Sequence, residues 1–192
     1  MAAFHDEFEQ WTTPKTFLAV LLLTILLAAG LGWGQTRLRG VPGGGVGILD
    51  SQIYYSGEQA YQHLQDLGED GRKIYKGLLF LDLAFAPVYP LFIAVGFGLV
   101  WKRFIPGEKR LWKLIPFLFL VTICDWLENI LILATLYAYP QHLLLVPDVA
   151  GFMTTAKWLF LIFNLALLAI GTGYSIAQRH SPSRRAPPTA SS

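Results

Sequence analysis

Four long apolar runs constrain the fold of this chain more than any other feature. They cover about residues 17–34, 77–101, 114–139 and 152–177. A helix needs about 20 mostly apolar residues to cross the hydrocarbon core of a bilayer, and each run approaches or exceeds that length. The runs are too long for strands, and the sequence shows no ten-residue alternation of the membrane β-barrel type. The sequence therefore predicts an all-α integral membrane bundle of four transmembrane helices.

Composition excludes several other classes of protein. Hydrophobic residues make up 54% of the chain and charged residues 15%, whereas a soluble domain usually carries about a quarter charged residues. A formal net charge of +2 without a basic stripe argues against a nucleic-acid partner. The single cysteine, Cys124, and four scattered histidines predict neither an internal disulfide nor a metal site. No cofactor is expected, and the first partner is the lipid bilayer.

The runs also set the domain organisation. Residues 1–180 are predicted to form a single transmembrane domain, and residues 181–192, rich in proline and serine, to form a disordered tail. The first run lacks the basic start of a signal peptide, so we expect it to be retained as a helix. Prolines 87, 90 and 116 fall inside predicted helices, where they should kink the backbone and free carbonyl groups for other partners.

The distribution of lysine and arginine predicts the orientation in the membrane. Four spans put both termini and the loop at 102–113 on one side, which holds nine basic residues against five on the other. Because cytoplasmic loops carry an excess of Lys and Arg, both termini are expected in the cytoplasm of a plasma or inner membrane. The nine residues are Lys15, Lys102, Arg103, Lys109, Arg110, Lys113, Arg179, Arg184 and Arg185.

Residues 35–76 form the one sizeable segment outside the predicted spans. The segment opens with a glycine-rich stretch at 40–47, which we interpret as a hinge or linker. Ser56 and Gln59 then stand at the spacing of a capping box, and apolar residues follow at helical intervals. A short amphipathic helix is therefore predicted at about 57–67, lying on the membrane surface or over the mouth of the bundle.

Polar residues inside the spans carry the sharpest functional signal, because a charged side chain at membrane depth is costly. Asp125, Glu128 and Asn129 stand at i, i+3 and i+4 and share one face of the third helix. The candidate ligand-binding or ion-pair residues are Asp82, Asp125, Glu128, Asn129, Lys157, Tyr75, Tyr89 and Asn164.

Depth brings three of these residues to one level of the membrane. Asp82, Glu128 and Lys157 each lie roughly 7–15 Å inside the same boundary, at 1.5 Å per helical residue. Lys157 is the one basic residue within the spans, so we expect it to pair with Glu128 or Asp82.

Three functions fit this pattern. The cluster could hold the bundle or a membrane-protein partner together, as in a structural or accessory protein or a homo-oligomer. It could instead form the floor of an acidic cavity that binds a lipid-like small molecule, in a binding protein or an enzyme. The third alternative is passage of protons or ions, which would need an oligomer. The sequence leaves open whether the chain is an enzyme, and no catalytic residue is assigned.

The chain also resembles a set of small, uncharacterised four-span membrane proteins, mostly bacterial. The resemblance covers about residues 50–160 and rests on Tyr55-Ser56-Gly57-Glu58, Asp82 and the element Asp125-Trp126-Leu127-Glu128-Asn129. It implies architecture and no activity. A more distant likeness in layout is to the emopamil-binding and sigma-receptor-like families, which implies a ligand cavity with acidic residues but specifies no substrate.

Overall fold

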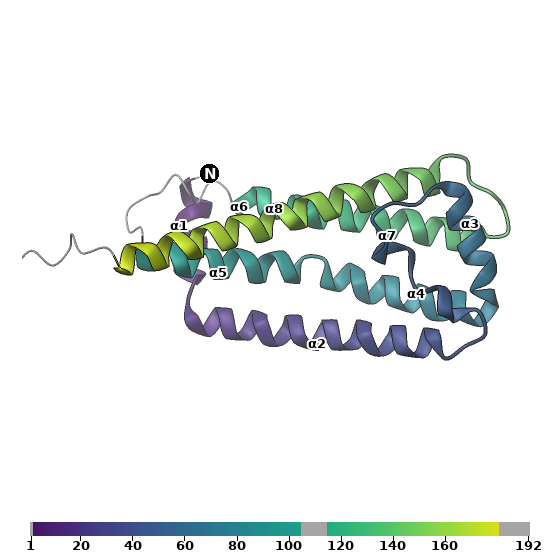
Figure 1. The fold of residues 1–192 in the computed structure, drawn as a ribbon, viewed down its shortest axis with the longest axis horizontal. Coiled ribbons are helices and arrows are strands. Elements are labelled where there is room, and N and C mark those ends of the chain that lie inside the picture. Colours follow the sequence, from purple (N-terminus) through teal and green to yellow (C-terminus); the bar gives the residue numbers. More distant parts are fainter. Residues whose placement is uncertain (1, 105–114, 181–192) are drawn as a thin grey trace, which may run out of the picture.

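The computed structural model describes residues 2–104 and 115–180. Four helical rods lie side by side, and the described residues contain no strand (Figure 1). The rods are α2 (Pro14–Arg39), α4 with α5 (Gly68–Phe85 and Val88–Phe104), α6 with α7 (Ile115–Leu118 and Leu120–Ala138), and α8 (Val146–His180). Each is long and apolar enough to cross a membrane. The predicted four-span helical bundle is thus confirmed.

The second and fourth spans begin before the predicted apolar runs. α4 begins at Gly68 rather than at residue 77, and α8 begins at Val146 rather than at residue 152. The added turns contain charged residues such as Glu69 and Asp148, so hydropathy alone does not reveal them. The expectations for Lys109, Arg110, Lys113 and the tail at 181–192 lie outside the described residues.

The two ends of the bundle carry different short helices. α1 (Ala2–Trp11) lies at the same end as the last turns of α8, and α3 (Gly57–Asp66) lies across the opposite end (Figure 1). We call these the α1 end and the α3 end. Lys102, on α5, donates to the backbone carbonyl groups of Glu9 and Thr12 and so ties the α1 region to the bundle.

α3 forms where the capping box predicts it. Ser56 Oγ accepts from the backbone N–H of Gln59 at 3.2 Å, and Gln59 Oε1 accepts from the N–H of Ser56 at 2.8 Å. Tyr61, Leu64 and Leu67 are buried against the bundle. Of the two predicted positions for this helix, the structure shows the one over the bundle mouth.

The glycine-rich stretch is a packed turn and not the loose linker expected from its composition. It contains the short 3-10 helix η1 (Gly44–Val46), and a second 3-10 helix, η2 (Leu49–Ser51), follows. A Cβ on Gly44 would lie 1.6 Å from the backbone oxygen of Leu38. Gly43 has φ +81°, and a Cβ there would lie 1.9 Å from the backbone oxygen of Asp66. The glycines are needed because backbones meet closely at this point.

Prolines break the second rod and orient it toward α7. Pro87 and Pro90 have no N–H to offer the carbonyl groups of Leu83 and Ala86, four residues earlier. Side chains of α7 replace those missing donors, since Trp126 Nε1 donates to Leu83 O at 2.9 Å and Thr122 Oγ1 donates to Ala86 O at 3.0 Å. The predicted use of freed carbonyl groups is observed, and it fixes the position of α4 and α5 against α7.

Candidate functional site

The buried polar cluster is centred where the polar face of α7 contacts α4. Asn129 Nδ2 donates to Asp82 Oδ2 at 2.8 Å and lies 3.4 Å from Asp125 Oδ1. Asp82, Asp125, Glu128 and Asn129 are all buried. The i, i+3, i+4 spacing places three polar side chains on the α7 face that packs against α4 and α8.

Lys157 joins α8 to this face. Its Nζ lies 2.6 Å from Glu128 Oε2 and 3.4 Å from Asp125 Oδ1. Thr154, one turn earlier on α8, donates to Glu128 Oε1 at 2.5 Å. Of the two partners expected for Lys157, the structure shows Glu128, and Asp125 takes the place of Asp82.

A segment outside the predicted spans completes the cluster, although none of its residues is among the predicted site residues. α4 packs chiefly against α2 and α7, whereas α8 packs chiefly against α7 and α5. The segment at 47–56 fills the remaining side. Trp158 and Thr155 of α8 donate to the backbone oxygens of Gln52 and Ile53 at 2.8 and 2.9 Å.

This segment brings a fourth carboxyl group, that of Asp50, to the cluster. Lys157 Nζ lies 3.5 Å from the backbone oxygen of Asp50, and the Tyr75 hydroxyl lies 3.5 Å from Asp50 Oδ1. Burial raises the pKa of the Asp50 carboxyl to about 7, although the Lys157 ammonium group opposes the shift. The available sequence signal was the apolar pair Ile48-Leu49 directly before Asp50, since both residues are buried.

The two candidate tyrosines have different positions. Tyr75 is buried under η2, where its hydroxyl accepts from the backbone N–H of Leu49 at 3.1 Å. Tyr89 donates to Asp125 Oδ2 at 3.1 Å. Both therefore contact the cluster from the second rod, which also carries Asp82.

Asn164, the remaining candidate, lies outside the cluster. Its Nδ2 donates to the backbone oxygen of Leu118 at 2.9 Å, at the break between α6 and α7. Asn164 stands seven residues after Lys157, which is about 10 Å along a helix. The residue shares a stripe with Lys157 but not its depth, and its contact is with a helix end.

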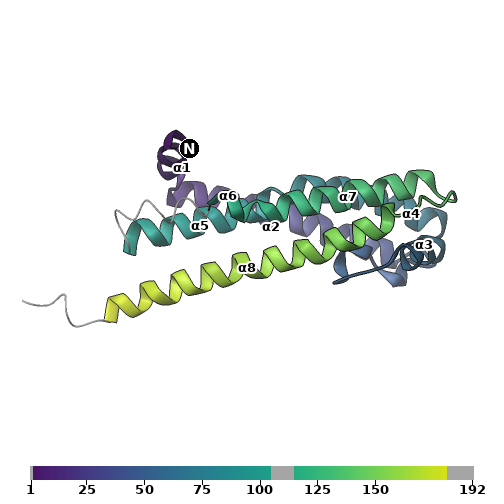
Figure 2. The ribbon, with the colours of Figure 1, turned by 90° about the horizontal axis from the view of Figure 1, so that it is seen from above.

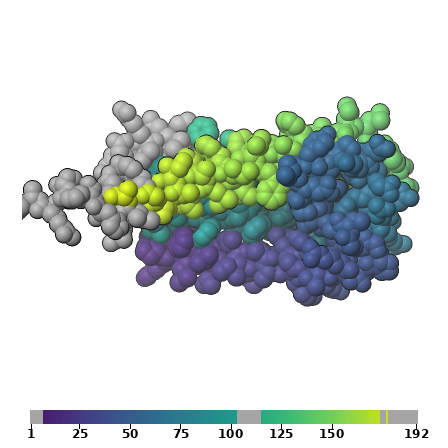
Figure 3. Space-filling model, viewed as in Figure 1, coloured from purple at the N-terminus to yellow at the C-terminus, as the bar shows by residue number. Residues whose placement is uncertain are grey.

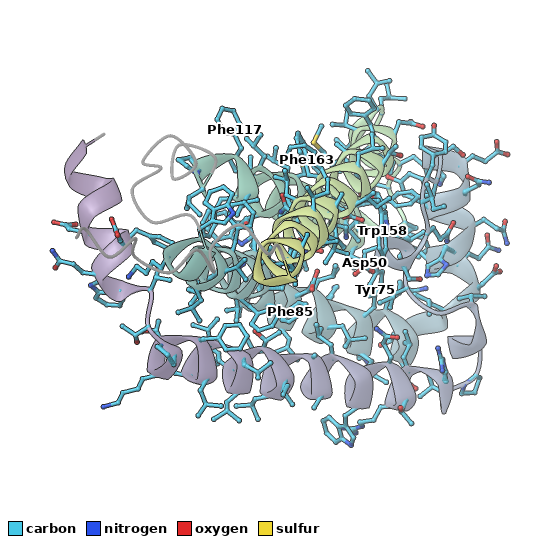
Figure 4. The ribbon with its side chains drawn as sticks, turned by 60° about the vertical axis from the view of Figure 1, so that its left-hand side comes forward. Asp50, Tyr75, Phe85, Phe117, Trp158 and Phe163 are labelled. Atoms are coloured by element: carbon cyan, nitrogen blue, oxygen red, sulfur yellow. The ribbon has the colours of Figure 1, made fainter. Side chains whose placement is uncertain are left out.

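A cavity of about 140 Å³ lies beside the polar cluster. Figure 4 shows Asp50, Tyr75 and Trp158 close together beside α8. The rim side chains Phe85, Trp158 and Leu161 are partly exposed, so the cavity reaches the outer surface of the bundle. The lining residues are Asp50, Asp82, Phe85, Tyr89, Asp125, Lys157, Trp158 and Leu161.

Charge is unbalanced around this cavity. Three lining side chains carry a carboxyl group, Glu128 adds a fourth behind Lys157, and Lys157 is the one basic side chain among the lining residues. Asp50 and Asp82 form no ion pair with another described residue. Since unpaired carboxylates are costly in a low-dielectric site, the cluster can gain from a proton or a cationic group. Within the described residues, no group of three or more His, Cys, Asp or Glu side chains is placed to hold a metal ion.

Comparison with protein-family models, curated proteins and solved structures finds no match to this chain. Fold and composition define its class: it is a multi-pass α-helical membrane protein with a buried polar cluster. The two resemblances drawn from sequence motifs and layout remain expectations.

Proposed function

We propose that this protein binds the small cationic head group of an amphiphile in the acidic cavity, while the apolar tail of the amphiphile stays in the bilayer. The observation that carries the proposal is the excess of carboxyl groups around an open cavity: Asp50, Asp82 and Asp125 line it with Lys157 alone as a basic residue. A cluster that served only as an ion-pair network would be expected to balance its charges more closely.

The walls of the cavity suit an ammonium group. Phe85, Tyr89 and Trp158 supply aromatic rings next to the carboxyl groups. Aromatic faces attract cations, and the combination of aromatic rings with negative charge is typical of sites for quaternary ammonium ligands. The carboxyl groups would then supply the charge and the rings the desolvated contact surface.

The size of the cavity limits the ligand to a head group. Pockets that enclose a whole drug-sized ligand measure about 300–1,000 Å³, and this cavity measures about 140 Å³. A lipid-like molecule enclosed entirely by protein would therefore not fit. The partly exposed rim at Phe85 and Leu161 leaves a path for an attached chain into the surrounding lipid.

A structural role is the second candidate, and a separate observation favours it. Lys157, Glu128 and Thr154 connect α8 to α7 through contacts of 2.6 and 2.5 Å. Such a network would fix the register of the bundle or of an assembly with a partner. The two roles are compatible, because the pair Lys157–Glu128 leaves Asp50 and Asp82 without an ion pair among the described residues.

A comparison of probes with equal tails tests the binding proposal. Protein in phosphatidylcholine nanodiscs is titrated with dodecyltrimethylammonium, dodecanol or dodecanoate, and the melting temperature is followed. Of the three probes, only dodecyltrimethylammonium should raise the melting temperature. Asp82→Asn should weaken this effect about ten-fold, because the amide oxygen still accepts from Asn129 but the charge is gone. The exposed Asp70→Asn serves as the matched control.

Two results would overturn the proposal. One is an equal stabilisation by dodecanol, which would indicate that the tail alone binds. The other is an ammonium effect that persists unchanged in both Asp82→Asn and Asp125→Asn.

We also propose that the α1 end faces the cytoplasm, on the strength of the lysine and arginine bias. Reporter fusions after Ser192 should give a cytoplasmic signal, and fusions near Gly45 should give a signal from the opposite side. The reverse pattern would invert the orientation.

A further inference from the structure

A second groove lies on the outer face of the bundle, between α2 and α4. It measures about 440 Å³ and is lined along its length by Gly30, Gly34, Gly77 and Leu81. Arg37 and Lys73 stand at its α3 end. The groove therefore combines an apolar trough with a basic end, which is the opposite charge pattern to that of the acidic cavity.

Glycines create the trough. A Cβ on Gly34 would lie 2.4 Å from Leu78 Cδ2, so this glycine lets α2 and α4 approach closely. Gly77 has a different effect, since a Cβ there would meet no atom within 4 Å. The missing side chain at Gly77 leaves open space along the groove, at a position where the protein itself imposes no steric limit.

The basic end is available to an anion. The Arg37 guanidinium group lies over the Trp33 ring, 5.0 Å from its centroid, and forms no ion pair with a described residue. Lys73 pairs with Glu69 at 2.7 Å and Asp70 at 3.7 Å, and all three side chains are largely exposed. Exposed pairs of this kind are weak, so a phosphate group could compete for Lys73.

The basic and apolar parts of the groove lie at the membrane depths of a lipid head group and of its acyl chains, respectively. α2 is one of the four helices able to cross the membrane, and Trp33 near its end is 64% exposed. Exposed tryptophan is typical of the membrane–water interface. Arg37 follows one turn later, about 6 Å nearer to water. Gly30 and Leu81 lie on the other side of Trp33, at the level of the hydrocarbon.

We infer that this groove binds an anionic phospholipid, with its phosphate group at Arg37 and Lys73 and an acyl chain in the trough beside Gly77 and Leu81. The groove offers complementary charge at the level of the head groups and open apolar space at the level of the chains. Lipid binding there does not depend on the function proposed for the acidic cavity, because the two sites share α4 but no lining residue, and their charges are opposite.

Native mass spectrometry of protein from nanodiscs of phosphatidylglycerol and phosphatidylcholine in equal amounts tests this inference. The wild-type protein should retain phosphatidylglycerol in preference, and Arg37→Gln should reduce the preference about five-fold. Lys73→Gln should have a smaller effect, because Lys73 is shared with two carboxylates. Arg37→Lys keeps the charge and should keep most of the preference.

Gly77→Leu tests the trough separately from the charge. It should lower retention of both lipids, since the new side chain occupies the space of the acyl chain. Two matched controls should behave as wild type. Arg39→Gln removes an exposed charge two residues from Arg37. Gly32→Leu adds a side chain outside the groove, at a position where a Cβ would meet no atom within 4 Å. Melting temperatures confirm that each variant is folded.

The inference would be overturned if the wild-type protein showed no preference for phosphatidylglycerol. It would also be overturned if Arg39→Gln lowered the preference as much as Arg37→Gln, because general surface charge would then suffice. Unchanged lipid retention in Gly77→Leu would overturn the placement of an acyl chain in the trough.

Discussion

The two ends of the bundle are packed by different means. At the α3 end a large apolar cluster lies beside buried charged and hydrogen-bonding side chains, and the segment at 47–56 covers those polar side chains. At the α1 end the buried cluster is apolar and consists of Ala94, Phe97, Trp101, Ile115 and Leu118. Figure 2 shows α8 diverging from the other helices toward the α1 end, and the space-filling view shows the α3 end covered by the short segments (Figure 3).

This difference is informative because apolar packing alone positions helices weakly in a membrane. Lipid tails are as apolar as leucine, so burial of apolar side chains between helices gives little net driving force. Hydrogen bonds and ion pairs do discriminate between arrangements. We therefore expect the polar cluster near the α3 end to set the register of the bundle, and the α1 end to tolerate substitution better.

The largest expected effect is that of Lys157→Met, which leaves Glu128 and Asp125 without their cation. Removing one partner of a buried pair typically costs about 3–5 kcal/mol. A double-mutant cycle with Glu128→Gln, measured as unfolding free energy in detergent, should recover part of that loss. The exposed Lys73→Met is the control and should change stability little. Coupling near zero with Glu128 and with Asp125 would contradict the ion-pair account.

The segment at 47–56 should be sensitive to Gly151→Ala. A Cβ at this position of α8 would lie 1.9 Å from the backbone oxygen of Tyr55, so the segment would have to move and lose its bonds to Thr155 and Trp158. We expect a loss of about 2–3 kcal/mol. Gly173→Ala is the matched control on the same helix, because its Cβ would meet no atom within 4 Å. Equal thermal stability of the two variants would show that the segment is not tightly held.

Asp50 should give the α3 end a pH dependence. Its pKa is about 7 in the folded protein and 3.8 ordinarily, so the folded state binds more protons between these values. Stability should therefore fall as the pH rises from about 4 to 7 and level off above 7, by roughly 2 kcal/mol after allowing for partial solvent exposure. Asp50→Asn should raise the melting temperature at pH 8 and change it little at pH 5. An identical pH profile in wild type and variant would refute this assignment.

The smallest effects are expected at the helix breaks. Thr122→Val and Trp126→Phe each leave a proline-freed carbonyl group without its donor, at about 1–2 kcal/mol. Asn164→Leu at the α6–α7 break should cost less, because Asn164 Oδ1 has no hydrogen-bond partner among the described residues and its burial is already unfavourable. Thermal unfolding of the three variants in one detergent checks the order. A larger loss in Asn164→Leu would contradict this ranking of the three hydrogen bonds.

Sequence predicted the parts of the site that lie on regular helices. Helical spacing alone put Asp125, Glu128 and Asn129 on one face, and depth put Lys157 near Glu128. It failed where position depends on tertiary contacts. Asp50 reaches the cluster because a loop enters between α4 and α8, and the apolar pair Ile48-Leu49 signals burial of that loop but not its partners. Asn164 lies seven residues after Lys157 and so on the same face of α8, but periodicity does not give the depth of a residue relative to other helices.

Proton release on binding tests the central claim, that the excess of carboxyl groups in the cavity takes a cationic head group. Isothermal titration of dodecyltrimethylammonium into nanodisc-embedded protein is run at pH 6 in two buffers of different ionisation enthalpy. A cation beside Asp50 lowers its pKa, so binding should release up to about one proton. The release should fall in Asp50→Asn and vanish at pH 9. Binding with no proton release at pH 6, or binding unaffected by Asp82→Asn and Asp125→Asn, would contradict the account.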